Sequence, residues 1–134
     1  MGLITYKPTT PSFRKTVKVD KSVLFKGRPE KNLIEELQPS SGRNNTGKIT
    51  IRHRSGGHKK KYRIINFKRN TFDKIGTVER IEYDPNRSAF IALVDYQDLK
   101  EYIIAPSDIK SGDKVISSIK AEINSGNAMK IKNI

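Results

Sequence analysis

The residues whose types could do chemistry are concentrated between positions 42 and 69. This stretch holds ten Lys/Arg and no Asp/Glu, with glycine at positions 42, 47, 56 and 57. Cations attract phosphate, and glycine lets a backbone approach phosphate and sugar closely or adopt a positive φ. The pattern therefore predicts a polyanion-binding segment. Its cations are Arg43, Lys48, Arg52, Arg54, Lys59, Lys60, Lys61, Arg63, Lys68 and Arg69.

Nucleic acid is the polyanion that best fits this segment. If roughly eight of these cations met phosphates of single-stranded RNA, counterion release would give a log–log salt slope of about −6. Asn44, Asn45, Thr46 and Thr50 lie between the cations and offer donors for phosphate oxygens and 2′-hydroxyls. A solvated linker is the alternative interpretation. A generic linker usually contains acidic residues or Ser/Gly repeats, and this segment has neither.

Two histidines flank a Ser-Gly-Gly sequence within the same segment, at His53 and His58. They could begin a metal site, but the chain has no cysteine and no carboxylate lies nearby in the sequence. Stacking on a base or hydrogen bonding to phosphate is favoured, and Gly56 and Gly57 join the predicted contacts. The spacing does not match a P-loop. We expect no cofactor, apart from structural Mg²⁺ bound by the RNA itself.

Outside this stretch, Arg80 and Arg87 are weaker candidates for RNA contact, because a lone charge on a strand usually faces solvent. Four carboxylates lie between positions 73 and 84 and could pair as acid and base. However, neither a convergent pocket nor a helix frame is predicted to present them. The sequence therefore predicts a binding protein and not an enzyme.

The net positive charge is confined to one half of the chain. Residues 1–69 contain 18 Lys/Arg against 4 Asp/Glu, whereas residues 70–134 contain 9 against 10. The longest apolar run, at 89–94, is six residues, far short of the ~20 that span a bilayer. Binding to an anionic membrane surface would need an amphipathic helix with an aromatic or leucine face, and none is predicted. We therefore expect no membrane partner.

The basic half is predicted to be an extended arm, residues 1–61. Positions 16–19 could form a short strand, and Pro29 could begin a short helix near 29–37. Leu33, Ile34 and Leu37 would share one face of that helix. Residues 42–61 offer only Ile49 and Ile51 as apolar surface, so an irregular conformation is expected until a partner binds.

The remaining residues, 62–134, are predicted to form an all-β domain, a small five-stranded antiparallel barrel or sandwich. Asp84-Pro85-Asn86-Arg87 has the chemistry of a tight turn and should close a hairpin. Val78, Ile81 and Tyr83 are expected to point inward despite one break in alternation. A helical turn is expected near 106–109 and a frayed strand at 128–134. The five strands are expected at 62–68, 76–83, 88–96, 100–105 and 114–119.

Two long strings also resemble a known family. GRNNTGKITIRHRSGGHKKKYRIINFKRN (42–70) and VERIEYDPNRSAFIALVDY (78–96) resemble the signature of the large ribosomal subunit protein two family. The pentapeptide at 102–106, the Gly-Asn pair at 126–127 and the opening residues 6–12 fit the same family. The resemblance covers essentially the whole chain, and the opening residues are similar to those of bacterial and organellar members.

The resemblance implies an OB-fold barrel for the C-terminal part and a path for residues 42–69 among large-subunit rRNA helices. It implies a structural constituent of the large ribosomal subunit, with neighbouring ribosomal proteins as partners and a role in translation and subunit association. Family members are about twice as long as this chain. We therefore expect the missing C-terminal half on a separate chain from a split gene, or a fragment, and assign no role at the peptidyl transferase centre.

Amino-acid composition suggests a source. Ile, Lys and Asn, which use AT-rich codons, make up 44 of the 134 residues. This bias predicts an organellar ribosome, mitochondrial before plastid, with the bacterial cytoplasm as the alternative. The alternative function is a non-ribosomal OB-type protein that binds single-stranded nucleic acid. That function would require aromatic side chains on an exposed barrel face.

Overall fold

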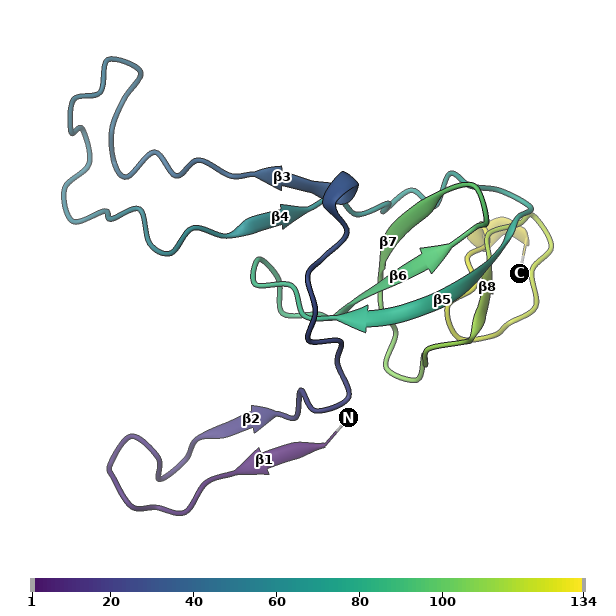
Figure 1. Cartoon of the computed structure of the whole chain (residues 1–134), viewed down its shortest axis with the longest axis horizontal. Helices are drawn as coiled ribbons and strands as arrows, with labels where there is room; N and C mark the ends of the chain where they lie inside the picture. Colours follow the sequence, from purple (N-terminus) through teal and green to yellow (C-terminus); the bar gives the residue numbers. More distant parts are fainter. Residues whose placement is uncertain (1, 134) are drawn as a thin grey trace.

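The computed structural model describes residues 2–133, and in this range the only helical elements are two 3-10 turns (Figure 1). The all-β prediction is therefore confirmed. A four-stranded sheet forms the centre, and two hairpins extend from it. The elements are β1 (Leu3–Thr5), β2 (Val17–Val19), η1 (Lys31–Leu33), β3 (Ile34–Glu36), β4 (Lys61–Arg63), β5 (Ile75–Glu82), β6 (Ile91–Asp95), β7 (Lys100–Ile104), β8 (Lys114–Ile116) and η2 (Ile131–Asn133).

The barrel sheet is antiparallel throughout, with strand order β7-β6-β5-β8. The hairpin between β5 and β6 forms at the predicted turn, where the Asp84 carboxylate accepts a hydrogen bond from the Asn86 amide at 2.9 Å. β6 is buried on both faces: Ile91 and Leu93 belong to one apolar cluster, and Ala92 and Val94 to another. The alternation of side chains along a strand thus lets one strand supply two halves of the core.

A β-bulge explains the break in alternation along β5. The register with β6 shifts between Val78 and Arg80, which inserts one extra residue. Val78 is buried and Ile81 half-buried, as predicted, but Tyr83 exposes 42% of its surface. The prediction that Tyr83 points inward was wrong, because the bulge and the end of β5 turn Glu82 into the protein instead.

An irregular segment, residues 65–73, connects the two edges of the barrel sheet. The sequence predicted a regular strand here, at 62–68. The start of the segment bonds to β7, with the Asn66 amide donating to the Tyr102 carbonyl at 2.9 Å. Its end bonds beyond β8, with the Asp73 amide donating to the Ser117 carbonyl at 2.8 Å. The predicted strand at 62–68 is thus reduced to its first residues, in β4, and a single bridge from Ile65.

The predicted arm consists of two hairpins. β1 pairs with β2, which confirms the short strand expected at 16–19, and β3 pairs with β4. The helix expected near 29–37 is wrong: only η1 forms, and the chain continues directly into β3. Pairing of Ile34 with Arg63 explains the difference, because a long-range backbone ladder outweighs the local helical pattern.

Two further local predictions differ from the structure. Residues 106–109 form a non-helical turn, and the strand expected at 128–134 is a single bridge at Ala128 followed by η2. The last residue of that predicted strand lies outside the described residues. Within 2–133 there is no helix of the length and apolarity needed to cross a bilayer.

Candidate nucleic-acid interface

The basic segment (residues 42–61) lies at the far end of the β3–β4 hairpin, away from the barrel sheet (Figure 1). Most of the predicted contacts are exposed there, and only Gly56 is half-buried. Lys59 makes one surface ion pair, to Glu36 at 3.1 Å, where solvent weakens the attraction. The exposed predicted residues are Arg43, Asn44, Asn45, Lys48, Arg52, His53, Arg54, Gly57, His58, Lys59, Lys60 and Lys61, with Lys68 exposed elsewhere.

One hydrogen-bonded turn gives the basic segment its local shape. The Asn44 side-chain oxygen accepts bonds from the Thr46 amide (3.1 Å), the Thr46 hydroxyl (2.8 Å) and the Lys48 amide (3.0 Å). Asn44 and Thr46 are therefore partly committed within the chain, and their effect is to orient Lys48 and its neighbours. The signal for this turn was present in the sequence, since Asn side chains commonly bond to backbone amides two residues on.

Gly42 closes the base of that turn. Its carbonyl accepts hydrogen bonds from the amides of Thr50 (2.9 Å) and Ile51 (3.1 Å), and its φ is +70°. A side chain at this position would meet the Ile51 carbonyl as well as strain the backbone. Gly42 therefore allows the chain to cross itself closely, which sets Arg43 and Lys48 on the same small loop.

Arg63 and Arg87 are turned into the protein. The Arg63 guanidinium donates to the Lys61 carbonyl at 2.9 Å and lies 3.9 Å from the Asp84 carboxylate. Arg87 donates to the same carboxylate at 2.6 Å, and Asp84 is fully buried. Both arginines thus neutralise a buried charge at the junction of β4 with the β5–β6 turn.

Arg69 and Arg80 are also occupied within the chain. Arg69, with a φ of +51°, donates to the Ser117 hydroxyl at 3.2 Å and to the Gly126 carbonyl at 3.0 Å. Arg80 donates to Glu82 at 2.7 Å and to Glu79 at 2.9 Å. Arg69 therefore ties its segment to the chain after β8, whereas Arg80 is paired with carboxylates of its own strand, β5. The geometry favours these intramolecular roles over contact with a ligand.

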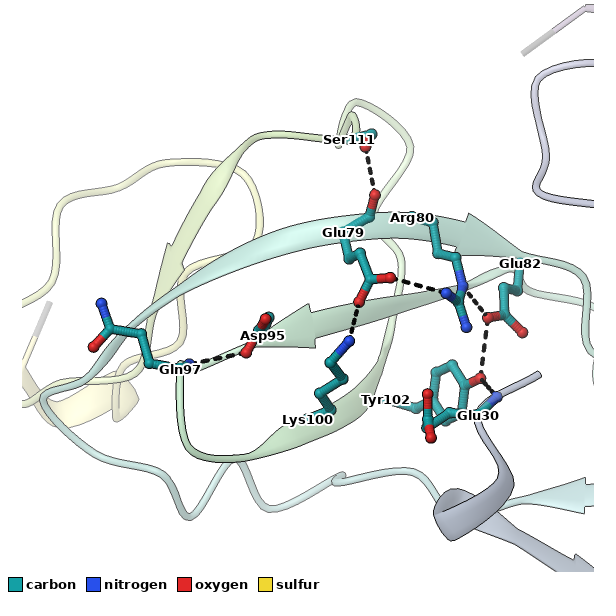
Figure 2. A network of polar contacts seen from close by, with 9 residues as sticks. All are labelled: Glu30, Glu79, Arg80, Glu82, Asp95, Gln97, Lys100, Tyr102 and Ser111. Atoms are coloured by element: carbon teal, nitrogen blue, oxygen red, sulfur yellow. Dashed lines mark hydrogen bonds and ion pairs between the residues drawn. The ribbon is translucent and has the colours of Figure 1, made fainter. Parts of the chain in front are cut away.

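A polar network joins the barrel to the base of the β3–β4 hairpin (Figure 2). The buried Tyr102 hydroxyl donates to Glu82 at 3.0 Å and accepts from the Glu30 amide, just before η1, at 2.9 Å. Burial raises the pKa of Tyr102 to about 12, so the hydroxyl keeps its proton. Sequence reasoning missed this anchor, because 72 positions separate its two ends and neither carries a local signal.

The carboxylates of the network are balanced by cations. Lys100 donates to Glu79 at 2.7 Å, and this hydrogen bond is the main reason that the pKa of Glu79 is lowered. The two histidines of the basic segment lie apart from these carboxylates, on the exposed loop. Within residues 2–133, no three His, Cys, Asp or Glu side chains gather as a metal site would require.

A family model described as "Ribosomal Proteins L2, RNA binding N-terminal domain" matches residues 30–117. This range includes both the basic segment and the barrel sheet. The chain belongs to the ribosomal protein L2 family. The resemblance seen in the sequence is thereby confirmed, and with it the OB-fold-like character of the all-β domain.

Individual relatives carry the name large ribosomal subunit protein uL2. The protein of Ruegeria sp. (strain TM1040) is 62% identical over 130 residues, which cover 96% of this chain and 46% of the relative. The proteins of Maricaulis maris and Rhizobium etli are 55% and 57% identical, covering 98% and 100% of this chain but 48% and 49% of the relatives. The chain therefore spans about half the length of the curated L2 relatives it matches.

These relatives come from bacteria. They fit the bacterial alternative for the source of the chain and give no support to the preference for an organelle, which rested on amino-acid composition alone.

Proposed function

We propose that this chain is a structural component of the large ribosomal subunit, and that its basic segment binds large-subunit rRNA. The observation that carries the proposal is the exposed, acid-free loop of residues 42–61 at the end of the β3–β4 hairpin. The description of the matching family model, which names RNA binding, supports the same function. The barrel sheet holds the hairpin in place and so determines where the loop meets the RNA.

Phosphate neutralisation is the proposed binding mechanism. Each exposed Lys or Arg of the basic segment releases a condensed counterion when it meets a phosphate. The turn organised by Asn44 presents Arg43 and Lys48 together, while Gly57 and the exposed histidines allow the backbone and imidazole rings to approach the RNA closely. Mg²⁺ held by the RNA itself neutralises phosphates that the chain does not reach.

The proposed interface leaves out four of the arginines predicted from sequence. The guanidinium groups of Arg63, Arg69, Arg80 and Arg87 are bonded to partners within the chain, so a contact with phosphate would have to break those bonds. Lys68, which is exposed on the barrel side, remains in the proposed interface.

Neighbouring ribosomal proteins and the C-terminal half of the family are the further proposed partners. We infer that sequence corresponding to that half is present in the same particle, and that the assembled protein supports translation and subunit association. Mass spectrometry of purified large subunits tests this inference directly. Absence of any peptide from that half in particles that contain this chain would disprove it.

The source of the chain is tested by the same particles. An organellar origin requires these peptides in mitochondrial or plastid ribosomes, whereas a bacterial origin requires them in cytoplasmic ones. The bacterial relatives support the second origin, and the first rests only on the high content of Ile, Lys and Asn.

Sedimentation of tagged chain from its host cells tests the main proposal. The wild-type chain should migrate with large subunits at moderate and high salt. A segment variant with Arg43, Lys48, Arg52, Arg54, Lys59 and Lys60 replaced by Gln should stay near the top of the gradient.

The matched control variant removes the same amount of charge from exposed lysines outside the arm: Lys74, Lys110, Lys114, Lys120, Lys130 and Lys132, each replaced by Gln. It should still enter large subunits. Incorporation of the segment variant at the wild-type level would disprove the proposed interface. RNA binding without any migration with ribosomal particles would instead favour the non-ribosomal alternative.

A further inference from the structure

The N-terminal hairpin, formed by β1 and β2, has no core of its own. Its apolar side chains Leu3, Ile4, Val17 and Val19 are all exposed. An isolated two-stranded hairpin is marginally stable in water, so this element gains by covering its surface with a partner. It precedes the range matched by the family model, which begins at residue 30.

A cleft separates this hairpin from the barrel. Its volume is about 410 Å³, and its walls include Tyr6 and Lys18 from the hairpin side and Tyr83 from the end of β5. Both tyrosines are exposed, which leaves part of each ring available for stacking. Phe90, which is buried, lies at the barrel side of the cleft and makes that wall apolar.

Each tyrosine of the cleft already contacts a cation. The Lys21 ammonium lies 3.5 Å from the centre of the Tyr83 ring, and the Lys18 ammonium lies 5.5 Å from that of Tyr6. Phe13 packs against Tyr6 with the ring centres 5.4 Å apart, which restricts the Tyr6 ring. Aromatic rings paired with cations are the combination that holds single-stranded nucleic acid, since bases stack on the rings while phosphates meet the cations.

Charge identifies RNA as the occupant of the cleft. The first 19 residues contain Lys7, Arg14, Lys15 and Lys18 and no Asp or Glu. An acid-free hairpin repels basic protein segments and attracts phosphate. We propose that the cleft between the N-terminal hairpin and the barrel binds an unpaired RNA nucleotide, whose base stacks on Tyr6 or Tyr83 and whose phosphates contact Lys18 and Lys21.

This site is separate from the basic segment. The N-terminal hairpin and the β3–β4 hairpin diverge from the barrel as two distinct prongs (Figure 1). The inference rests on the proposed function for the class of ligand, RNA, but it differs in chemistry. The basic segment acts through charge and serves duplex or single strand alike, whereas the cleft requires a base that has left its stack.

Binding of a short single-stranded RNA containing 2-aminopurine tests the proposal on the full chain. Stacking on tyrosine should quench the 2-aminopurine fluorescence. The double variant Tyr6→Leu/Tyr83→Leu should lose the quenching and bind the single strand about tenfold more weakly, as expected for the loss of base stacking. Binding of the same sequence annealed as a duplex should change less than about twofold, because no unpaired base is present.

Two controls separate stacking from general damage. Tyr6→Phe/Tyr83→Phe keeps both rings and should restore quenching and affinity. Phe72→Leu removes an exposed aromatic ring that does not line the cleft and should have no effect. Lys18→Gln/Lys21→Gln should make the salt slope less steep by about 0.7 for each lysine.

Unchanged quenching in the leucine variant, or equal losses for single strand and duplex, would overturn the cleft as a nucleotide site. If RNA affinity still fell steeply with salt, and the segment variant reduced that salt dependence, the proposed function would stand and only the nucleotide site in the cleft would be rejected. If the full chain bound no RNA at all, both would fail. If the tyrosine variants bound RNA as the wild type does but lost a protein that co-purifies with the wild type, the cleft would be assigned to a protein partner instead.

Discussion

In the barrel sheet, Ile91 and Leu93 are fully buried, whereas at the end of the β3–β4 hairpin Ile49 and Ile51 expose 65% and 56% of their surface. Charges differ in the same way. Asp84 is buried between two arginines, while the ion pair of Glu36 with Lys59 lies in solvent. One region therefore gains its structure from its own core, and the other keeps its side chains free for a partner.

The comparison shows that neighbouring cations of one sequence motif can have different roles, one exposed to solvent and the other part of the folded core. Lys60 and Arg63 are three positions apart, yet the first is exposed and the second buried. The difference begins where β4 reaches the barrel and Asp84 becomes available. The cations of the basic segment before that point remain exposed, whereas Arg63 just after it stabilises the fold and Lys68 further on is exposed again.

The largest expected effect comes from the buried carboxylate. Asp84→Ala leaves Arg63 and Arg87 partly buried without their counter-charge and should lower the free energy of unfolding by about 3–5 kcal/mol. Glu36→Ala removes the exposed ion pair with Lys59 and should change the free energy of unfolding by less than about 1 kcal/mol. Urea denaturation measures both. Equal effects would remove the distinction between the two regions.

Core truncation provides the second test. Leu93→Ala removes a fully buried side chain from the barrel and should cost about 2–5 kcal/mol. Ile49→Ala in the basic segment should change stability by less than about 0.5 kcal/mol, because that side chain is mostly in water already. Thermal unfolding of the two variants decides the matter, and a large loss for Ile49→Ala would mean that the segment packs against the chain.

A smaller effect is expected where the two regions meet. Tyr102→Phe removes the hydroxyl that binds the Glu30 amide and Glu82, at an expected cost of about 1–2 kcal/mol. Hydrogen exchange at Glu30 should accelerate by more than exchange in β6, since the bond to that amide is lost directly. Equal acceleration at both places would mean that the hydroxyl stabilises the barrel without anchoring the hairpin.

The same hydroxyl should make stability depend on alkaline pH. Burial raises the folded-state pKa of Tyr102 from 10.0 to about 12, so the unfolded chain releases this proton first. The associated stability is complete below pH 10 and is lost as the pH rises toward 12. Denaturation midpoints across this range should fall for the wild-type chain and fall less for Tyr102→Phe, whereas parallel decreases would exclude Tyr102 as the group responsible.

Local patterns in the sequence were sufficient for part of this structure. The turn at 84–87, the strands on either side of it and the acid-free segment follow from neighbouring residues, because turn chemistry and alternation act over short distances. The helix expected near 29–37 failed, since the pairing of Ile34 with Arg63 is decided by residues far apart in the chain.

The candidate site was predictable in composition but not in accessibility. The partners of Arg69 lie at Ser117 and Gly126, and those of Arg63 include Asp84, so no inspection of residues 42–69 alone could separate free cations from structural ones. The cleft beside Tyr83 was missed for a related reason. The bulge in β5 accompanies a change of side-chain direction that the sequence pattern did not reveal.

The salt dependence of RNA affinity tests the central claim most directly. On a short single-stranded RNA, the segment variant lacking Arg43, Lys48, Arg52, Arg54, Lys59 and Lys60 should show a log–log slope less steep than wild type by about 4. The control variant, which loses the same number of positive charges as lysines from the barrel side and the C-terminal residues, should change the slope by less than about 1. Equal slopes for the two variants would contradict the assignment of RNA binding to the basic segment.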